Sequence, residues 1–433
     1  MLSSGFRRTT AIFGVLRSRE LRAFWFSDWV SDAGSFVTFI ALAVYVNQLT
    51  GSPAAIGLAL GLRSIPWFTI GPFAGVLADR LDRRRVMIGS NLARGALVAL
   101  LPFTTSLWQV YVIALASAAF GPLFRSARSA LLPLVAPEGR LVPALAVIET
   151  THQALHTVGP ALGGLIVFLV GAREAFFVDA ASFVLASGFL VALSPRGRPA
   201  REPRSAVHDM AEGIRGVVAA PSVRAYALLN ASLSLGYGGL IALLVPYLGD
   251  ELRRPGGDYG IVLAAMGLGT VLTSLAIASR DDRHPRGPWA VASVAGMAVF
   301  LAILARPSFL ALLPVAVVAG LGDAGASIPM AATMAEVLPD ALRGRAYSAV
   351  TAFTELTAAI GSIGFAWLGE PGHVGVVIGM ALAAGVGAAL GLAALAGGGA
   401  VAINRRERIR LSTLVPAGLR QPDAGTSDSD VAR

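Results

Sequence analysis

Long apolar runs separated by short polar stretches fill the chain from residue 22 onward. A helix needs about 17 to 25 apolar residues to cross the hydrocarbon core of a membrane. Twelve runs satisfy this requirement, so the pattern predicts an all-α membrane protein with twelve transmembrane helices. The predicted spans are 22–47, 54–78, 86–104, 107–129, 141–171, 175–194, 223–248, 259–279, 288–305, 308–334, 345–369 and 372–402.

The composition supports this pattern and narrows the function. Of 433 residues, 55 % are hydrophobic and 14 % are charged, whereas soluble domains carry about a quarter charged residues. The net charge of +9 does not indicate a nucleic-acid surface, because the basic residues occupy short loops between apolar runs. Cysteine is absent, which excludes disulfides, thiolate catalysis and cysteine metal sites. We expect no cofactor and no metal.

The arginines, which make up all 35 basic residues, predict the orientation. The first apolar run is too long for a signal peptide and lacks a small-residue cleavage site, so we interpret it as the first span. With the N-terminus inside, 29 arginines lie on the cytoplasmic side, 4 lie outside, and Arg63 and Arg94 lie within spans. The positive-inside rule then places both termini in the cytoplasm.

A weak internal repeat predicts two pseudo-symmetric six-helix halves. The stretch ADRLDRRR from Ala78 and the stretch ASRDDRHP from Ala278 match at four positions and occupy equivalent loops. The predicted division is an N-terminal half at 1–194, a linker at 195–221 with a short interfacial helix near 206–219, a C-terminal half at 222–402, and a basic, then disordered, cytoplasmic tail at 403–433.

The loop GVLADRLDRRRV at 75–86 resembles a signature of the major facilitator superfamily of secondary transporters. The superfamily pattern G-x-L-A-D-R-x-G-R-R is matched at Gly75, Leu77, Ala78, Asp79, Arg80, Arg83 and Arg84. Asp82 stands in place of the second glycine. The stretches FGPLFRSARSALLPLVAP, GPALGG, FVDAASF and LPDALRGRAYS are similar to the bacterial branch that contains macrolide-efflux and siderophore-export proteins.

This resemblance implies a major facilitator fold and a monomeric transporter in the bacterial plasma (cytoplasmic) membrane. It favours proton-coupled efflux of amphipathic small molecules, either drugs or secondary metabolites, by alternating access across the lipid bilayer. The alternatives are export of a siderophore or another anionic metabolite, for which Arg63 and Arg94 would be suited, and a non-transporting receptor with the same fold. Uptake also stays open, because fold does not set direction. The sequence carries no HExxH, GxSxG or GxxxxGK[ST] motif, so we predict neither an enzyme nor a nucleotide-driven pump.

Two motifs predict specific structural roles. Asp79 can face the positive end of a neighbouring helix, and Arg80, Arg83 and Arg84 can pair with carboxylates or anionic lipid headgroups. Together with Gly75 they form a predicted conformational latch, with enforcement of topology as the simpler alternative. In the motif GPALGG, the small residues let another helix approach closely and the proline loosens local hydrogen bonding. The residues of this packing motif are Gly159, Pro160, Gly163 and Gly164.

Polar stripes on two predicted spans point to a functional face. Residues spaced i, i+3, i+4 and i+7 share one helical face. Span one carries Asp28, Ser31, Asp32 and Ser35, and span five carries Glu149, His152, Gln153 and His156. Intramembrane polar groups are costly unless they face a cavity or a partner. We therefore expect these stripes to face the protein interior.

Proton coupling is assigned to Asp28 and Asp32. Two carboxylates four residues apart repel when both are ionised, which favours a proton on one of them. The resemblance implies that the first helix of each half borders the central cavity, where substrate and proton could compete. The alternative is pairing with Arg22 or another loop arginine.

Other buried polar groups receive secondary roles. Glu149, His152 and His156 form the second candidate relay, because histidine titrates near neutral pH. Glu355 is a candidate for the substrate path or for a hydrogen-bonded packing role. Arg94 and Asp179 are expected to form structural ion pairs.

Overall fold

The computed structural model describes residues 14–71, 73–74, 81–194, 206–279 and 286–397. All the regular elements in these ranges are helices, as the sequence predicts. Ten described helices are long and apolar enough to cross a membrane, and helix α8 (Leu141–Val170) contributes two shorter apolar segments. The count of twelve spans and the cytoplasmic position of both termini stay predictions.

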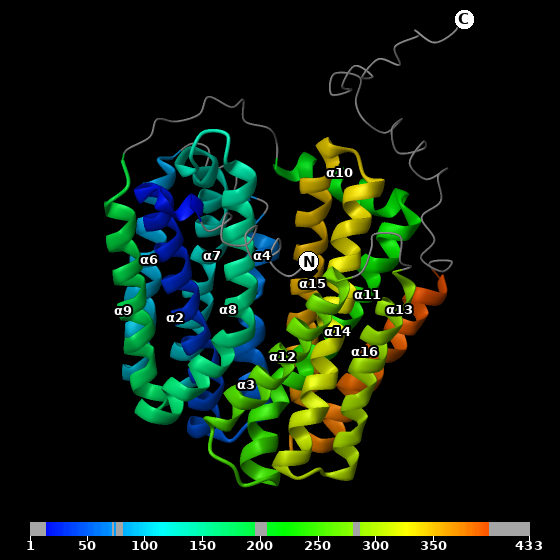
Figure 1. Ribbon diagram of the computed structural model, residues 1–433. Helices are drawn as coiled ribbons and strands as arrows, with labels where there is room; N and C mark the ends of the chain where they lie inside the picture. The colour runs from blue at the N-terminus through cyan, green and yellow to red at the C-terminus, as the bar shows by residue number, and fades with distance from the viewer. Residues whose placement is uncertain (1–13, 72, 75–80, 195–205, 280–285, 398–433) are drawn as a thin grey trace, which may run out of the picture.

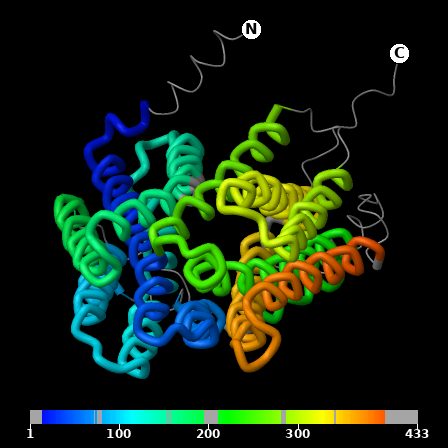
Figure 2. The backbone as a smooth tube through the Cα atoms, turned by 90° about the horizontal axis from the view of Figure 1, so that it is seen from below, coloured from blue at the N-terminus to red at the C-terminus, as the bar shows by residue number. Residues whose placement is uncertain are grey.

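The helices form two bundles that lie side by side (Figures 1 and 2). The first bundle contains α2 (Arg19–Thr50), α3 (Pro53–Leu62), α4 (Ile65–Thr69), α6 (Arg83–Leu100), α7 (Leu107–Val135), α8 and α9 (Ala172–Val191), with short helices η1 (Gly14–Arg17) and η2 (Leu101–Phe103). The second bundle contains α11 (Pro221–Pro246), α12 (Asp258–Ala278), α13 (Gly287–Ala298), α14 (Phe309–Val337), α15 (Asp340–Leu368) and α16 (Val376–Gly397), with η3 (Tyr247–Glu251) and η4 (Val299–Ala305).

Local sequence signals explain where several helices begin. The Ser18 hydroxyl accepts a hydrogen bond from the backbone N–H of Leu21 at the start of α2. Ser52 caps α3 in the same way, and Pro53 occupies the first turn, where a missing N–H costs nothing. Ser308 caps α14. These serines satisfy backbone donors that a helix leaves unpaired at its N-terminus.

The second predicted span, 54–78, is not one continuous helix. It is divided into α3 and α4, with a break at Arg63 and Ser64. Pro66 lies in the first turn of α4 and cannot donate the backbone hydrogen bond that would continue α3 into it. The break therefore places Arg63 and Ser64 at a turn inside the protein.

The helix predicted near 206–219 in the linker is present as α10 (Ala206–Ala219). It packs on α15 of the second bundle, where a Cβ on Gly213 would lie 2.4 Å from the backbone oxygen of Arg345. An ion pair between Arg345 and Glu212 reinforces this contact. α10 therefore packs against the second bundle. Its position at a membrane interface stays a prediction.

The described part of the 75–86 loop ties three helices of the first bundle together. Asp82 has φ −64° and caps α6, its carboxylate accepting a hydrogen bond from the N–H of Arg85 at 2.9 Å. No glycine is needed at this position, which explains the departure from the superfamily pattern. Arg83 donates to the backbone oxygen of Ala130 in α7 at 3.0 Å, and Arg84 donates to that of Leu190 in α9 at 2.8 Å.

Three residues of the predicted latch, Gly75, Asp79 and Arg80, lie outside the described residues. The contacts of Arg83 and Arg84 nonetheless show how the loop is anchored. Both guanidinium groups bind backbone oxygens within the last two turns of their partner helices, α7 and α9. The latch itself stays a prediction.

Two glycine seams join the bundles. Along the α3–α15 seam, a Cβ on Gly57 would lie 2.3 Å from the backbone oxygen of Ser362, whose hydroxyl donates to the Gly57 oxygen at 3.1 Å. Along the α8–α12 seam, a Cβ on Gly164 would lie 2.5 Å from the Cα of Gly260. The backbones therefore approach more closely than any residue with a side chain would permit.

Candidate functional site

A central cavity of about 410 Å³ lies between the two bundles. The first bundle supplies part of its wall from α2, α3 and α8, and the second supplies the rest from α11, α12, α14 and α15. Its lining is Phe36, Phe39, Leu60, Gly61, Ser64, Pro160, Ser234, Tyr237, Gly238, Ile241, Leu263, Met266, Gly267, Thr270, Gly320, Asp323, Ala358, Ala359 and Ser362. A mostly apolar cavity with a few polar groups is the usual form of a small-molecule site.

Asp323 is the charged member of this lining among the residues that the structure describes. It lies in the middle of α14 yet is exposed, because its side chain borders the cavity. No ion pair reaches it within the described ranges. One turn earlier, the Ala319 backbone oxygen accepts a hydrogen bond from the Tyr237 hydroxyl at 2.6 Å. The cavity thus presents a carboxyl group among apolar and aromatic surfaces.

Further contacts across both seams join the bundles on one side of the cavity. Beyond Gly57 and Gly164, the Glu370 carboxylate of the second bundle meets the N-terminus of α3 in the first. It accepts hydrogen bonds from the Ser52 hydroxyl and, at 3.0 Å, from the backbone N–H of Ala54. A carboxylate at a helix N-terminus is stabilised by the helix dipole and by unpaired N–H groups. This cross-bundle contact, the Glu370 tie, lies at the end that the arginine distribution predicts to be extracytoplasmic.

Replacing Glu370 with glutamine should open this end more often. The substitution keeps the side-chain size but removes the charge from the α3 N-terminus, a contribution of about 0.3–2 kcal/mol. Such a loss shifts a two-state population by roughly 2- to 30-fold. The chain has no native cysteine, so a single cysteine at the cavity-lining Ala358 can be labelled in cells with an impermeant maleimide. We expect faster labelling in Glu370→Gln.

The matched control for this prediction is Glu174→Gln, which removes a carboxylate from the first turn of α9 without touching α3. Labelling at position 358 should then proceed at the rate of the parent. Equal labelling in the parent and in Glu370→Gln would show that the tie does not hold the end closed.

The predicted proton-coupling residue Asp28 is held in a bidentate ion pair. Arg128 of α7 donates to both carboxylate oxygens, from Nε at 2.6 Å and from Nη2 at 2.8 Å. Asp28 is 5 % exposed. The alternative prediction is that Asp28 pairs with a loop arginine. An arginine is its partner, but that arginine lies within helix α7 and not in a loop. This pair joins α2 to α7 inside the first bundle.

The other predicted polar residues gather around the same point. His152 Nε2 of α8 lies 3.3 Å from an Asp32 carboxylate oxygen, and Glu149 lies 4.0 Å from Arg128 while remaining largely exposed. The structure therefore brings residues of the α2 and α8 stripes together, a contact that the spacing alone does not predict, whereas Glu149 is exposed and not interior. The side chain of His156 lies outside the described residues. Within the described ranges, no group of three or more acidic or histidine side chains is arranged to hold a metal ion.

Glu355 lies at the contact between the bundles. Its carboxylate accepts a hydrogen bond from the Ser64 hydroxyl at 2.9 Å, at the break between α3 and α4. Ser64 also lines the central cavity. Glu355 thus has the predicted hydrogen-bonded packing contact and lies beside a cavity residue at the same time.

The GPALGG motif of α8 forms packing surfaces on two sides. A Cβ on Gly159 or Gly163 would collide with Phe36 of α2, and Gly164 meets Gly260 of α12. Pro160 lines the central cavity. The motif therefore connects α2, the cavity wall and the other bundle.

Two residues of the site, Asp323 and Arg128, are not among the candidates that the sequence predicts. Only its position on the cavity wall distinguishes Asp323 from other acids on apolar helices. Arg128 falls at the end of the apolar run 107–129, and a charged residue at such a position is the signal that could have identified it.

Comparisons with known proteins agree with this architecture. A family described as transmembrane secretion effectors matches residues 10–413. An MFS-type transporter of Bacillus subtilis, YfiS, which has no characterised function, is 25 % identical over 360 residues, covering 79 % of this chain and 85 % of its own. The enterobactin exporter EntS of Escherichia coli O1:K1 is 27 % identical over 385 residues, covering 84 % of this chain and 88 % of its own.

Solved structures show the same fold at lower identity. A bacterial homologue of the human lysosomal transporter Spinster, in an inward-facing state, superposes with a TM-score of 0.71 at 13 % identity, covering 92 % of this chain and 97 % of its own. The nucleoside transporter NupG gives a TM-score of 0.71 at 14 % identity, with 87 % and 99 % covered.

Proposed function

We propose, from the premise that this chain belongs to the transmembrane secretion effector family of major facilitator transporters, that it exports amphipathic small molecules in exchange for protons. Members of this family and fold are transporters, so the chain is a multi-pass membrane transporter of small molecules and not an enzyme. The direction of transport, the coupling ion, the monomeric state and the bacterial plasma membrane as its location are parts of the proposal.

The observation that supports it most directly is the central cavity, because both bundles contribute to its wall and the seams join them on one side of it. Alternating access requires a binding site between two bodies whose contacts exchange from one end to the other. The lining is apolar on most sides and carries a carboxyl group. This combination suits an amphipathic molecule that bears a cationic or hydrogen-bond-donating group.

The proposed topology follows the arginine distribution. Twelve spans are divided between halves at 1–194 and 222–402, with the linker at 195–221 and the tail after residue 402 in the cytoplasm. The end with the Glu370 tie would then face outward, and the cavity would load from the cytoplasm. Loading from inside is the arrangement that export requires.

The proton is proposed to act at the junction of α2 and α8. Asp32 and His152 attract each other most strongly when the imidazole carries a proton and the carboxylate does not. Any change in this protonation therefore alters how α8 is held against α2. Because α8 also forms a seam with α12 through Gly164, such a change can reach the contact between the bundles. Asp28 is proposed as the fixed member of this network, oriented by Arg128.

Substituting Asp32 with asparagine should uncouple transport from the proton gradient. Proteoliposomes loaded with an amphipathic fluorescent cation such as ethidium would be assayed with and without an imposed pH gradient. We expect the parent to move the dye uphill with the gradient, and Asp32→Asn to retain only exchange that runs down the dye gradient.

Glu138→Gln, at an exposed loop acid, is the matched control and should behave as the parent. Uphill transport by Asp32→Asn with an unchanged pH profile would remove Asp32 from the coupling mechanism. Binding of the dye by the parent without any flux would favour the receptor alternative.

Export of an anionic metabolite is the second candidate, because EntS is an enterobactin exporter by its name and aligns over most of this chain. The same vesicles can be loaded with anionic and cationic amphiphiles of similar size. A clear preference for anionic compounds would replace the cationic substrate class and leave the transporter assignment unchanged.

A further inference from the structure

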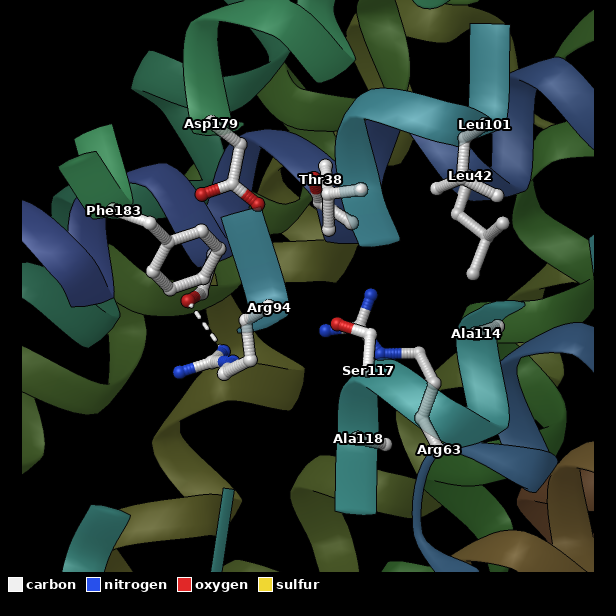
Figure 3. A pocket seen from close by; sticks show the side chains of 12 residues that line it. Thr38, Leu42, Arg63, Arg94, Leu101, Ala114, Ser117, Ala118, Asp179 and Phe183 are labelled. Atoms are coloured by element: carbon white, nitrogen blue, oxygen red, sulfur yellow. Dashed lines mark hydrogen bonds between the residues drawn. The ribbon is translucent and has the colours of Figure 1, made fainter. Parts of the chain in front are cut away.

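A second, smaller cavity of about 30 Å³ lies inside the first bundle, between α2, α3, α6, α7 and α9 (Figure 3). It shares no lining residue with the central cavity among the residues described. Its polar lining consists of Ser35, Thr38, Arg63, Arg94, Ser117 and Asp179, set among apolar side chains. The volume holds one or two water molecules or a single small ion.

Two guanidinium groups and one carboxylate face this space. Arg94 donates to the Ser35 hydroxyl at 3.0 Å and lies 4.3 Å from the Phe183 ring centre, whereas its buried Nε has no hydrogen-bond partner among the described residues. Arg63 lies 5.7 Å from the Phe39 ring centre. In the described part of the chain, its guanidinium group forms no hydrogen bond or ion pair.

Asp179 does not neutralise these arginines directly. It is 1 % exposed and accepts a hydrogen bond from the Ser182 hydroxyl at 3.1 Å. Among the described residues, no ion pair within 4.0 Å joins it to Arg63 or Arg94, although its carboxylate and both guanidinium groups attract each other at longer range. Figure 3 shows the side chains of Asp179, Arg94 and Arg63 entering the cavity from three different segments.

Two further acids lie near the small cavity but do not line it. Asp28 is bound by Arg128, and Asp32, one turn before Ser35, lies against His152 and within electrostatic reach of Arg94. The described lining itself carries two guanidinium groups and one carboxylate. A charge within the membrane is costly unless a counter-ion or a set of hydrogen bonds compensates it.

We propose that this cavity binds one halide-sized anion between Arg63 and Arg94. The guanidinium N–H groups and the Ser117 hydroxyl are the donors that an anion requires, whereas the Ser35 hydroxyl donates to the Ser31 backbone oxygen and helps to orient Arg94. The volume excludes a larger anion, so an anionic substrate belongs in the central cavity and not here. The ion is a resident ligand of the first bundle, independent of what the transporter exports.

The position of Arg63 gives the ion a structural consequence. Arg63 precedes Ser64, whose hydroxyl binds Glu355 of the second bundle. An anion that neutralises the Arg63 charge therefore stabilises the turn between α3 and α4, where Ser64 contacts Glu355 of α15. Halide occupancy should accordingly stabilise the folded protein and not merely screen its surface.

Titration of the purified full-length protein with bromide, at constant ionic strength and with gluconate as the replacement anion, tests the proposal. We expect saturable binding of one bromide per chain by calorimetry and a parallel rise in the melting temperature. Arg63→Gln and Arg94→Gln should each weaken bromide binding roughly 10- to 100-fold. Chloride should compete with bromide for the site.

Arg173→Gln is the matched control, because Arg173 lies in the same bundle and binds the Pro102 backbone oxygen outside the cavity. It should bind bromide as the parent does. If Arg63→Gln misfolds, Arg63→Lys keeps the charge and should retain measurable binding. Absence of saturable binding in the parent, or undiminished binding in Arg63→Gln or Arg94→Gln, would overturn the proposal. Since no flux is measured, the outcome is separate from that of the transport assays.

Discussion

Export of cationic amphipathic probes should fall by roughly 10- to 100-fold when Asp323 is replaced by asparagine. A hydrogen bond that involves a charged group contributes about 1.5–3 kcal/mol, which corresponds to that range. The central cavity offers a bound cation no other carboxylate among its described lining residues. Asparagine keeps the shape of the side chain, so loss of charge is the main change.

The measurement compares a cationic dye with a neutral dye of similar size in the same proteoliposomes. Asp323→Asn should affect the neutral dye much less, and Asp323→Glu should retain part of the cation transport. Asp250→Asn changes an exposed acid outside the cavity and should behave as the parent. Equal losses for both dyes would assign Asp323 to structure and not to recognition of charge.

Removing the Arg128 guanidinium should produce the largest loss of stability. In Arg128→Gln the Asp28 carboxylate stays buried without its bidentate partner, and breaking one side of a buried ion pair costs about 3–5 kcal/mol. Thermal unfolding in detergent should show a much lower midpoint than the parent. Expression in the membrane should fall with it.

A double-mutant cycle separates the ion pair from the loss of packing around Arg128. The double variant Asp28→Asn, Arg128→Gln should recover much of the stability that Arg128→Gln loses, because no unpaired charge is left. Arg140→Gln, at an exposed loop arginine, is the control and should unfold near the parent temperature. Additive effects of the two single changes would show that the pair contributes little.

The transmembrane pattern could be predicted because apolar length is a local property of the sequence. Each predicted span in the described ranges overlaps a helix. The separately predicted linker helix is present as α10. The division of the second span into α3 and α4 was missed, although Pro66 was visible in the sequence. An apolar run averages over a single proline, and only the packed structure shows that the backbone turns at Ser64.

The site was harder to predict because it depends on how helices rotate against each other. The spacing of Asp28 and Asp32 correctly placed both on an interior face, yet their partners come from α7 and α8, far along the chain. The sequence pattern does not predict which way Asp323 points. α14 is apolar nearly all round, so no polar stripe identifies the face that meets the cavity.

Because Glu370 accepts a hydrogen bond from the Ala54 amide, the exchange of this one backbone hydrogen reports how often the two bundles separate. While the bundles are joined, this N–H is held by a carboxylate of the other bundle. It lies in the first turn of α3, where no carbonyl of its own helix can accept it. Its exchange with solvent deuterium therefore requires separation at that end, and the exchange rate counts openings in a protein that carries neither label nor substrate.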